Sequence, residues 1–150
     1  MLARPLGNRG ETLEMLGRHA DAERDLRRAV ELAAAWVGPD HPWGAYSMTA
    51  LGKTLTAEGR PQEAAVVLDK ALHIRERSEP NKELLAETRF ALAEARWQAG
   101  GDPSGARAPA ESALATYRAL PTHSKEASEV ESWLATRRVG HAVRARSSEP

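Results

Sequence analysis

A unit of 42 residues recurs along this chain and constrains its fold more than any other feature of the sequence. Shifting the sequence by this length aligns residues of the same kind: Gly10 with Gly52, Leu13 with Leu55, Gly17 with Gly59, Ala22 with Ala64, Leu26 with Leu68 and Ala29 with Ala71. A second shift aligns Gly59 with Gly101, Pro61 with Pro103, Ala64 with Ala106 and Ala71 with Ala113. A fixed period of this size indicates stacked copies of one supersecondary unit.

Each unit has the pattern of two helices joined by a tight turn. Leu26, Ala29 and Ala33 follow the three-to-four spacing of an apolar helix face. Glycine and proline separate such segments, which predicts helices over residues 6–16, 21–36, 42–58, 61–77, 82–99, 103–119 and 124–138. Asp40 or His41 is the expected N-cap of the third helix. Pro109 should kink the first half of its helix or delay its start.

The composition favours neither nucleic acid nor a membrane as the partner. The 21 basic and 21 acidic residues sum to a net charge of zero. The chain has no cysteine, which excludes disulfides and Cys-ligated zinc. No apolar run approaches the ~18 residues that a membrane-spanning helix needs. We therefore expect a soluble, cytoplasmic protein.

The residues of the second unit carry a resemblance to a known family. The pattern Leu51-Gly52, Leu55, Gly59, Ala64, Leu68, Ala71 resembles the tetratricopeptide repeat, whose paired helices carry small residues at close contacts. That repeat is ordinarily ~34 residues long. The longer unit and its linker Gly38-Pro39-Asp40-His41-Pro42 resemble the kinesin-light-chain type. The stretch over residues 84–97 also resembles the C-terminal repeat arrays of bacterial serine/threonine protein kinases.

The resemblance implies an all-α fold, a right-handed α-solenoid of three helix-turn-helix repeats plus a C-terminal capping helix. We expect the array to cover residues 3–138, with repeats over 3–38, 42–79 and 82–119 and the cap over 124–138. The cap should turn Ala127, Val130, Trp133 and Leu134 inward. Residues 139–150 show no periodicity and are expected to be disordered.

The resemblance places a binding groove on the concave side, which is lined by the first helix of each repeat. The partner-binding residues it implies are Asn8, Glu11, Tyr46, Thr49, Lys53, Thr88 and Gln98. Trp43, in the first turn of its helix, is a further exposed contact. The occupant would be a protein or peptide. The alternative that the groove only spaces other domains stays open.

No motif in the sequence supports catalysis, a metal or a cofactor. The five histidines show neither His-x-x-x-His nor His-Glu-x-x-His spacing. The run over residues 100–105 is rich in glycine but lacks the lysine and the spacing of a phosphate-binding loop. The predicted function is therefore a non-catalytic protein–protein interaction scaffold. The alternative is the regulatory C-terminal array of a bacterial serine/threonine protein kinase.

The first helix has the weakest sequence of the seven. Gly7 and Gly10 lie inside it, and interior glycine costs ~1 kcal/mol relative to alanine. We expect residues 1–18 to fray or to self-associate.

Overall fold

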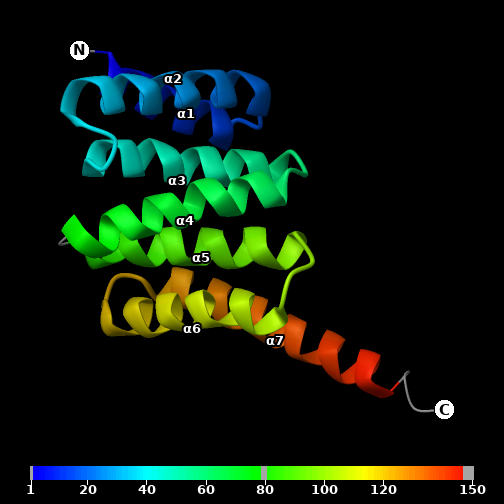
Figure 1. Cartoon of the computed structure of the whole chain (residues 1–150). Helices are drawn as coiled ribbons and strands as arrows, with labels where there is room; N and C mark the ends of the chain where they lie inside the picture. Colours follow the sequence, from blue (N-terminus) through cyan, green and yellow to red (C-terminus); the bar gives the residue numbers. More distant parts are fainter. Residues whose placement is uncertain (1, 79–80, 147–150) are drawn as a thin grey trace.

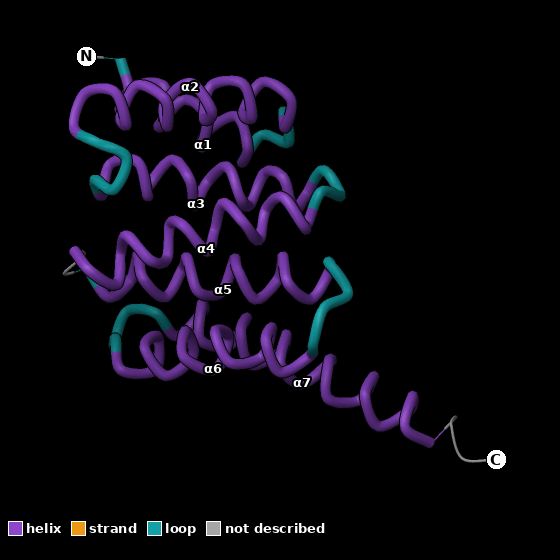
Figure 2. Tube along the Cα trace, in the orientation of Figure 1, coloured by secondary structure: helices purple, strands orange, loops and turns teal. Residues whose placement is uncertain are grey.

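The computed structural model describes residues 2–78 and 81–146, with side chains as far as Arg137. The described residues form seven helices and no strand: α1 (Ala3–Met15), α2 (His19–Val37), α3 (Pro42–Ala57), α4 (Pro61–Ser78), α5 (Lys82–Gln98), α6 (Pro103–Ala119) and α7 (Ser124–Arg146). Consecutive helices form hairpins that stack in chain order, and the loops alternate between the two sides of the stack (Figures 1 and 2). The predicted all-α solenoid is confirmed.

The helices form two layers, because the first helices of successive repeats contact one another. α1 packs on α3 and α3 packs on α5, in addition to the partner of each within its own hairpin. An ion pair from Arg27 to Glu63 joins the second helices α2 and α4, and Arg60, in the turn just before α4, pairs with Glu23 of α2. We call the side presented by α1, α3 and α5 the helix-A face.

Glycine allows the two helices of each of the first two hairpins to approach closely. A Cβ atom added to Gly52 would lie 2.3 Å from Cγ of Leu68, and one added to Gly10 would lie 2.5 Å from Cγ of Leu26. Both leucines are fully buried. The recurrence of glycine opposite leucine therefore reflects one packing solution used twice.

The third hairpin departs from the 42-residue period. The turns of the three hairpins contain Gly17, Gly59 and Gly100, each with φ between 72° and 75°. Gly17 and Gly59 are 42 residues apart, but Gly59 and Gly100 are 41 residues apart. Gly100 therefore takes the place in the turn that the sequence alignment predicted for Gly101. The turn that follows α5 is one residue longer than the turn that follows α3, so α6 returns to the 42-residue spacing at Pro103. Residues of α5 are consequently offset from those of α3 by 41, which corrects the alignment predicted for this helix.

α6 begins at Pro103 and continues through Pro109, so its start is not delayed. A proline has no N–H to donate to the carbonyl group four residues earlier. That carbonyl oxygen belongs to Gly105, and it accepts a hydrogen bond from Nη1 of Arg96 at 3.0 Å. Nη2 of Arg96 also pairs with Asp69 of α4 at 2.7 Å. One guanidinium group thus replaces the missing donor and joins α4, α5 and α6.

α7 covers the end of the stack as predicted. Its buried residues are Ala127, Val130, Trp133 and Leu134. The ring of Trp133 contacts Phe90 and Trp97 edge-on, with centroid distances of 5.8 and 6.0 Å. The helix continues to Arg146, past its predicted end at residue 138, because proline is absent from this stretch and most of its residues tolerate a helix. Residues 147–150 of the predicted disordered tail lie outside the described residues.

Among the described residues, no helix has both the length and the apolar character needed to cross a bilayer.

Candidate protein-binding groove

Two pockets lie along the helix-A face, one after the other. The first pocket has a volume of about 480 Å³ and is lined by Ala3, Arg4, Asn8, Pro42, Trp43, Tyr46, Ser47, Arg75 and Leu84. The second pocket has a volume of about 360 Å³ and is lined by Lys53, Glu83, Glu87, Phe90, Ala91, Glu94, Tyr117, His123, Glu126 and Glu129. A further hollow of about 230 Å³ adjoins the second pocket through Lys53, Ala91 and Glu94, and reaches Gln98. We call these three hollows together the groove.

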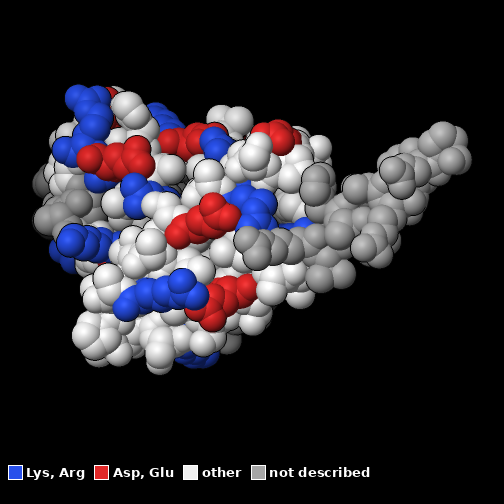
Figure 3. Space-filling view, turned by 90° about the horizontal axis from the view of Figure 1, so that it is seen from below, with Lys and Arg blue, Asp and Glu red and all other residues white. Residues whose placement is uncertain are grey.

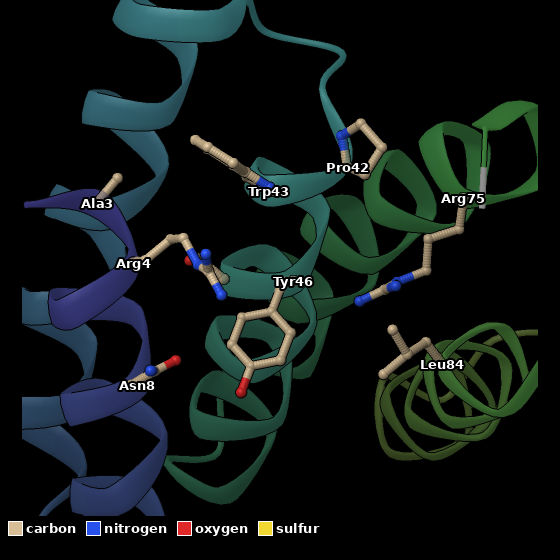
Figure 4. Close-up of a pocket in the computed structure, with 9 residues that line it drawn as sticks. Ala3, Arg4, Asn8, Pro42, Trp43, Tyr46, Arg75 and Leu84 are labelled. Atoms are coloured by element: carbon tan, nitrogen blue, oxygen red, sulfur yellow. The ribbon is translucent and has the colours of Figure 1, made fainter. Parts of the chain in front are cut away.

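The first pocket is basic and aromatic. Figure 4 shows Arg4 of α1 and Arg75 of α4 extending from opposite sides, with Tyr46 of α3 between them. The guanidinium carbon of Arg4 lies 5.7 Å from the centre of the Trp43 ring. His41 caps α3 by accepting a hydrogen bond on Nδ1 from the backbone N–H of Trp43 at 3.2 Å. This cap helps to fix the indole at the mouth of the pocket.

Tyr46 joins α3 to α1 across the groove. Its hydroxyl donates a hydrogen bond to the carboxylate of Glu11. Burial, followed by the hydrogen bond and the charge of Glu11, raises the pKa of Tyr46 to about 12. The phenol therefore stays protonated and continues to donate at any physiological pH.

The second pocket is acidic. Lys53 pairs with Glu87 at 3.3 Å. His123 lies 3.0 Å from Glu83, a contact that is an ion pair only when the imidazole is protonated. Tyr117 of α6 stacks on His123 with ring centroids 5.9 Å apart. Among the residues whose side chains are described, Lys53 is thus the only permanently charged cation that lines this pocket, against five carboxylates.

The predicted binding residues lie at different depths. Asn8, Trp43 and Tyr46 line the first pocket, Lys53 lines the second, and Gln98 lies in the adjoining hollow. Glu11 is partly buried and bonds to Tyr46. Thr49 and Thr88 are buried instead, at 3% and 0% exposure, and their hydroxyls bond to each other at 2.9 Å. These two threonines hold α3 against α5 and present almost no surface to a partner.

Thr88 was predicted to face the groove because an offset of 42 residues aligns it with Tyr46. In the structure the offset between α3 and α5 is 41 residues, so this alignment is wrong. With an offset of 41, Tyr46 corresponds to Glu87, Thr49 to Phe90 and Lys53 to Glu94. Burial supports this register, since Ala50, Leu51 and Gly52 are buried as are Ala91, Leu92 and Ala93. The groove residues missed from the sequence are therefore Glu87, Phe90 and Glu94. Matching Leu92-Ala93 to Leu51-Gly52, and Gly100 to Gly59, would have found them.

The comparison with known families agrees with this architecture. A family model described as Tetratricopeptide repeat matches residues 1–77, half of the chain. The chain belongs to the tetratricopeptide repeat family. No curated protein matches the sequence.

The direction of its pKa shift distinguishes Glu94 from Glu23, Asp25, Glu63 and Asp102 of this tetratricopeptide array, whose pKa values are lowered. Burial raises the pKa of Glu94, Glu129 adds to the rise, and Arg137 and Lys53 oppose it. Burial acts to lower the pKa of Lys53, but Glu87 and Glu14 outweigh it, so that the pKa lies above its ordinary value. Lys53 therefore stays charged, whereas ionised Glu94 is held in an environment that disfavours its charge.

The surface elsewhere is mixed. Basic and acidic side chains lie next to one another on the face shown in Figure 3. Within the residues whose side chains are described, no group of three or more His, Cys, Asp or Glu residues could hold a metal ion. The groove of this tetratricopeptide array thus offers polar, aromatic and charged contacts.

Proposed function

We propose that this tetratricopeptide array is a non-catalytic scaffold that binds a protein or peptide on the concave helix-A face. The succession of pockets along α1, α3 and α5 is the observation that supports it. Tetratricopeptide repeats generally mediate protein–protein interaction, and a groove of this kind suits an extended segment or a helix. The proposal includes a cytoplasmic location and no cofactor.

Two groups of residues would make the contacts. Asn8 and Tyr46, with Trp43 at the rim, would contact one end of the partner. Lys53 and Gln98 would contact the other end. In the alternative, the array is the C-terminal regulatory or scaffolding part of a bacterial serine/threonine protein kinase, but no contact within residues 2–78 and 81–137 favours that role.

The test blocks the groove with bulk. Thr56 and Gln98 both line the hollow beside the second pocket, and Gln98 is exposed. We expect Thr56→Trp/Gln98→Trp to lose the proteins that the parent chain captures from a cell lysate, as measured by quantitative mass spectrometry. The matched control is Gln62→Trp/Val66→Trp, which adds the same bulk at exposed positions of α4. Equal capture by the parent and the groove variant, with unchanged circular dichroism, would show that the helix-A face is not the binding surface.

Self-association through residues 1–18 remains a separate proposal. Leu2, Met15 and Leu16 are 65%, 80% and 68% exposed, which supports an apolar contact at this end. Sedimentation velocity over a concentration series should show a larger species that Met15→Ser/Leu16→Ser removes. A single species at all concentrations of the parent would refute it.

A further inference from the structure

The second pocket holds carboxylates that have no direct ion-pair partner, although Arg137 and Lys53 act on Glu94 from a longer distance. Glu94, Glu126 and Glu129 make no ion pair or hydrogen bond with the rest of the described chain, whereas Glu87 pairs with Lys53. Most carboxylates outside the groove are paired, as in Arg60–Glu63, Arg96–Asp69 and Arg118–Glu131. An unpaired charge in a partly desolvated site has an electrostatic reason to attract an opposite charge.

A buried tyrosine in the same pocket also lacks a partner. Tyr117 is only 5% exposed and lines the pocket, and no described residue forms a hydrogen bond with its hydroxyl. The hydroxyl oxygen keeps some solvent-accessible surface although the residue as a whole is buried, so a ligand in the pocket can reach it. The hydroxyl could accept a hydrogen bond from an incoming N–H group, which a lysine ammonium or an arginine guanidinium would provide. This feature is independent of the carboxylates and points to the same ligand chemistry.

Aromatic rings complete the lining. The ring of Phe90 lies in the pocket wall with Tyr117, and aromatic faces attract cations. The volume of about 360 Å³ lies in the range of pockets that enclose small ligand groups. The pocket therefore offers negative charge, a hydrogen-bond acceptor and π surfaces within one cavity.

We propose that the second pocket binds a lysine or arginine side chain from a basic segment of the partner protein, between Glu94 and Glu129 and against Phe90 and Tyr117. This inference rests on the proposed function and specifies the chemistry of the partner. Charge complementarity selects this occupant, because an acidic segment would add charge of the same sign to a site that already has unpaired carboxylates. Lys53 weakens the attraction of the pocket for an incoming cation, because it is itself positively charged and already forms an ion pair with Glu87.

The experiment measures peptide binding to the full chain by fluorescence anisotropy at low salt. The probe is a labelled, end-blocked peptide in which lysine alternates with glycine, and its counterparts carry glutamine or glutamate in place of lysine. We expect the lysine peptide to bind at least about tenfold more tightly than either counterpart. Glu94→Gln/Glu129→Gln should weaken it by about tenfold, and Tyr117→Phe, which keeps the ring, should weaken it by about threefold.

The control separates the pocket from the total charge. Glu31→Gln/Asp40→Asn removes the same charge at exposed positions of the first repeat and its linker, and should leave binding of the lysine peptide within about twofold. Lys53→Gln should strengthen that binding, because it releases Glu87. Equal losses in the two double variants, or no loss in either, would overturn the proposal.

The two proposals fail in different ways. If a captured protein is lost by the groove-blocking variant but not by Glu94→Gln/Glu129→Gln, the groove assignment holds and the basic partner is wrong. If the lysine peptide binds as expected while the groove-blocking variant still captures every protein, the pocket is real but the helix-A groove is not the scaffold's main surface.

Discussion

The two pockets of the groove are built on the same scaffold and have opposite chemistry. Equivalent positions that line the two pockets carry different residues: Tyr46 in the first corresponds to Glu87 in the second, and Arg75 corresponds to Tyr117. The first pocket has two arginines and no carboxylate in its lining, and the second has five carboxylates. The same repeat backbone therefore carries basic side chains at the first pocket and acidic side chains at the second.

The difference also extends to what holds each pocket together. The first pocket lies against the second hairpin, whose two helices pack closely where Gly52 meets Leu68. Ala93 and Ala110 occupy the corresponding positions of the third hairpin. The second pocket depends on α7, whose Trp133 packs on Phe90 and Trp97. The following four substitutions test this contrast, from the largest expected effect to the smallest.

Trp133→Ala should have the largest effect, because it removes the ring that anchors α7. Trp133 is 8% exposed, and truncation of a buried tryptophan costs about 4 kcal/mol. Urea unfolding followed by circular dichroism measures the loss. Trp36→Ala is the matched control, since Trp36 is 69% exposed and should change stability by less than about 1 kcal/mol. Similar losses for both would show that α7 does not close the stack through Trp133.

Gly52→Ala tests how the second hairpin is sealed. The added methyl group would lie 2.3 Å from Cγ of Leu68, and overpacking of this kind costs about 2 kcal/mol. The double variant Gly52→Ala/Leu68→Ala copies the pair found in the third hairpin, and it should be less destabilised than the sum of the two single variants. Additive losses would mean that the two positions do not share one space.

Arg96→Ala tests the substitute donor of the third hairpin. The change leaves the carbonyl group of Gly105 without its hydrogen bond and breaks the pair with Asp69, at a cost of about 1–2 kcal/mol. The second hairpin has Val67 where the third has Pro109. Pro109→Val restores an N–H at this position, so Arg96→Ala should cost less in that background. If Arg96→Ala destabilises the Pro109→Val variant as much as the parent, the loss of stability comes from the ion pair with Asp69 alone.

Glu94→Gln should have the smallest effect, and its sign depends on pH. The folded-state pKa of Glu94 is raised, so the folded chain binds the proton more tightly than the unfolded chain, in which the pKa of glutamate is ~4.3. Below that pH the two proteins should be equally stable. As the pH rises through the folded pKa, the parent loses stability and the variant becomes the more stable one. A variant less stable than the parent at pH 7 would contradict this prediction.

The sequence predicted the architecture well because glycine, alanine and leucine recur where the backbone needs them. The number and order of the helices and the inward face of α7 follow from that pattern, whereas the end of α7 does not. The groove was harder to predict, since it depends on a one-residue register that Gly100 sets and Gly101 obscures. The depth of Thr49 and Thr88 could not be predicted either, because burial of a small polar side chain depends on the neighbouring helix.

The hydrogen bond from Arg96 to Gly105 makes α6 depend on α5, which precedes it in the chain. Pro109 leaves the carbonyl group of Gly105 without its donor from within α6, and α5 supplies that donor through Arg96. Asp69 holds the same guanidinium from the α4 side, and both partners are synthesised before Gly105. The order of emergence from the ribosome thus matches the order in which the contacts can form.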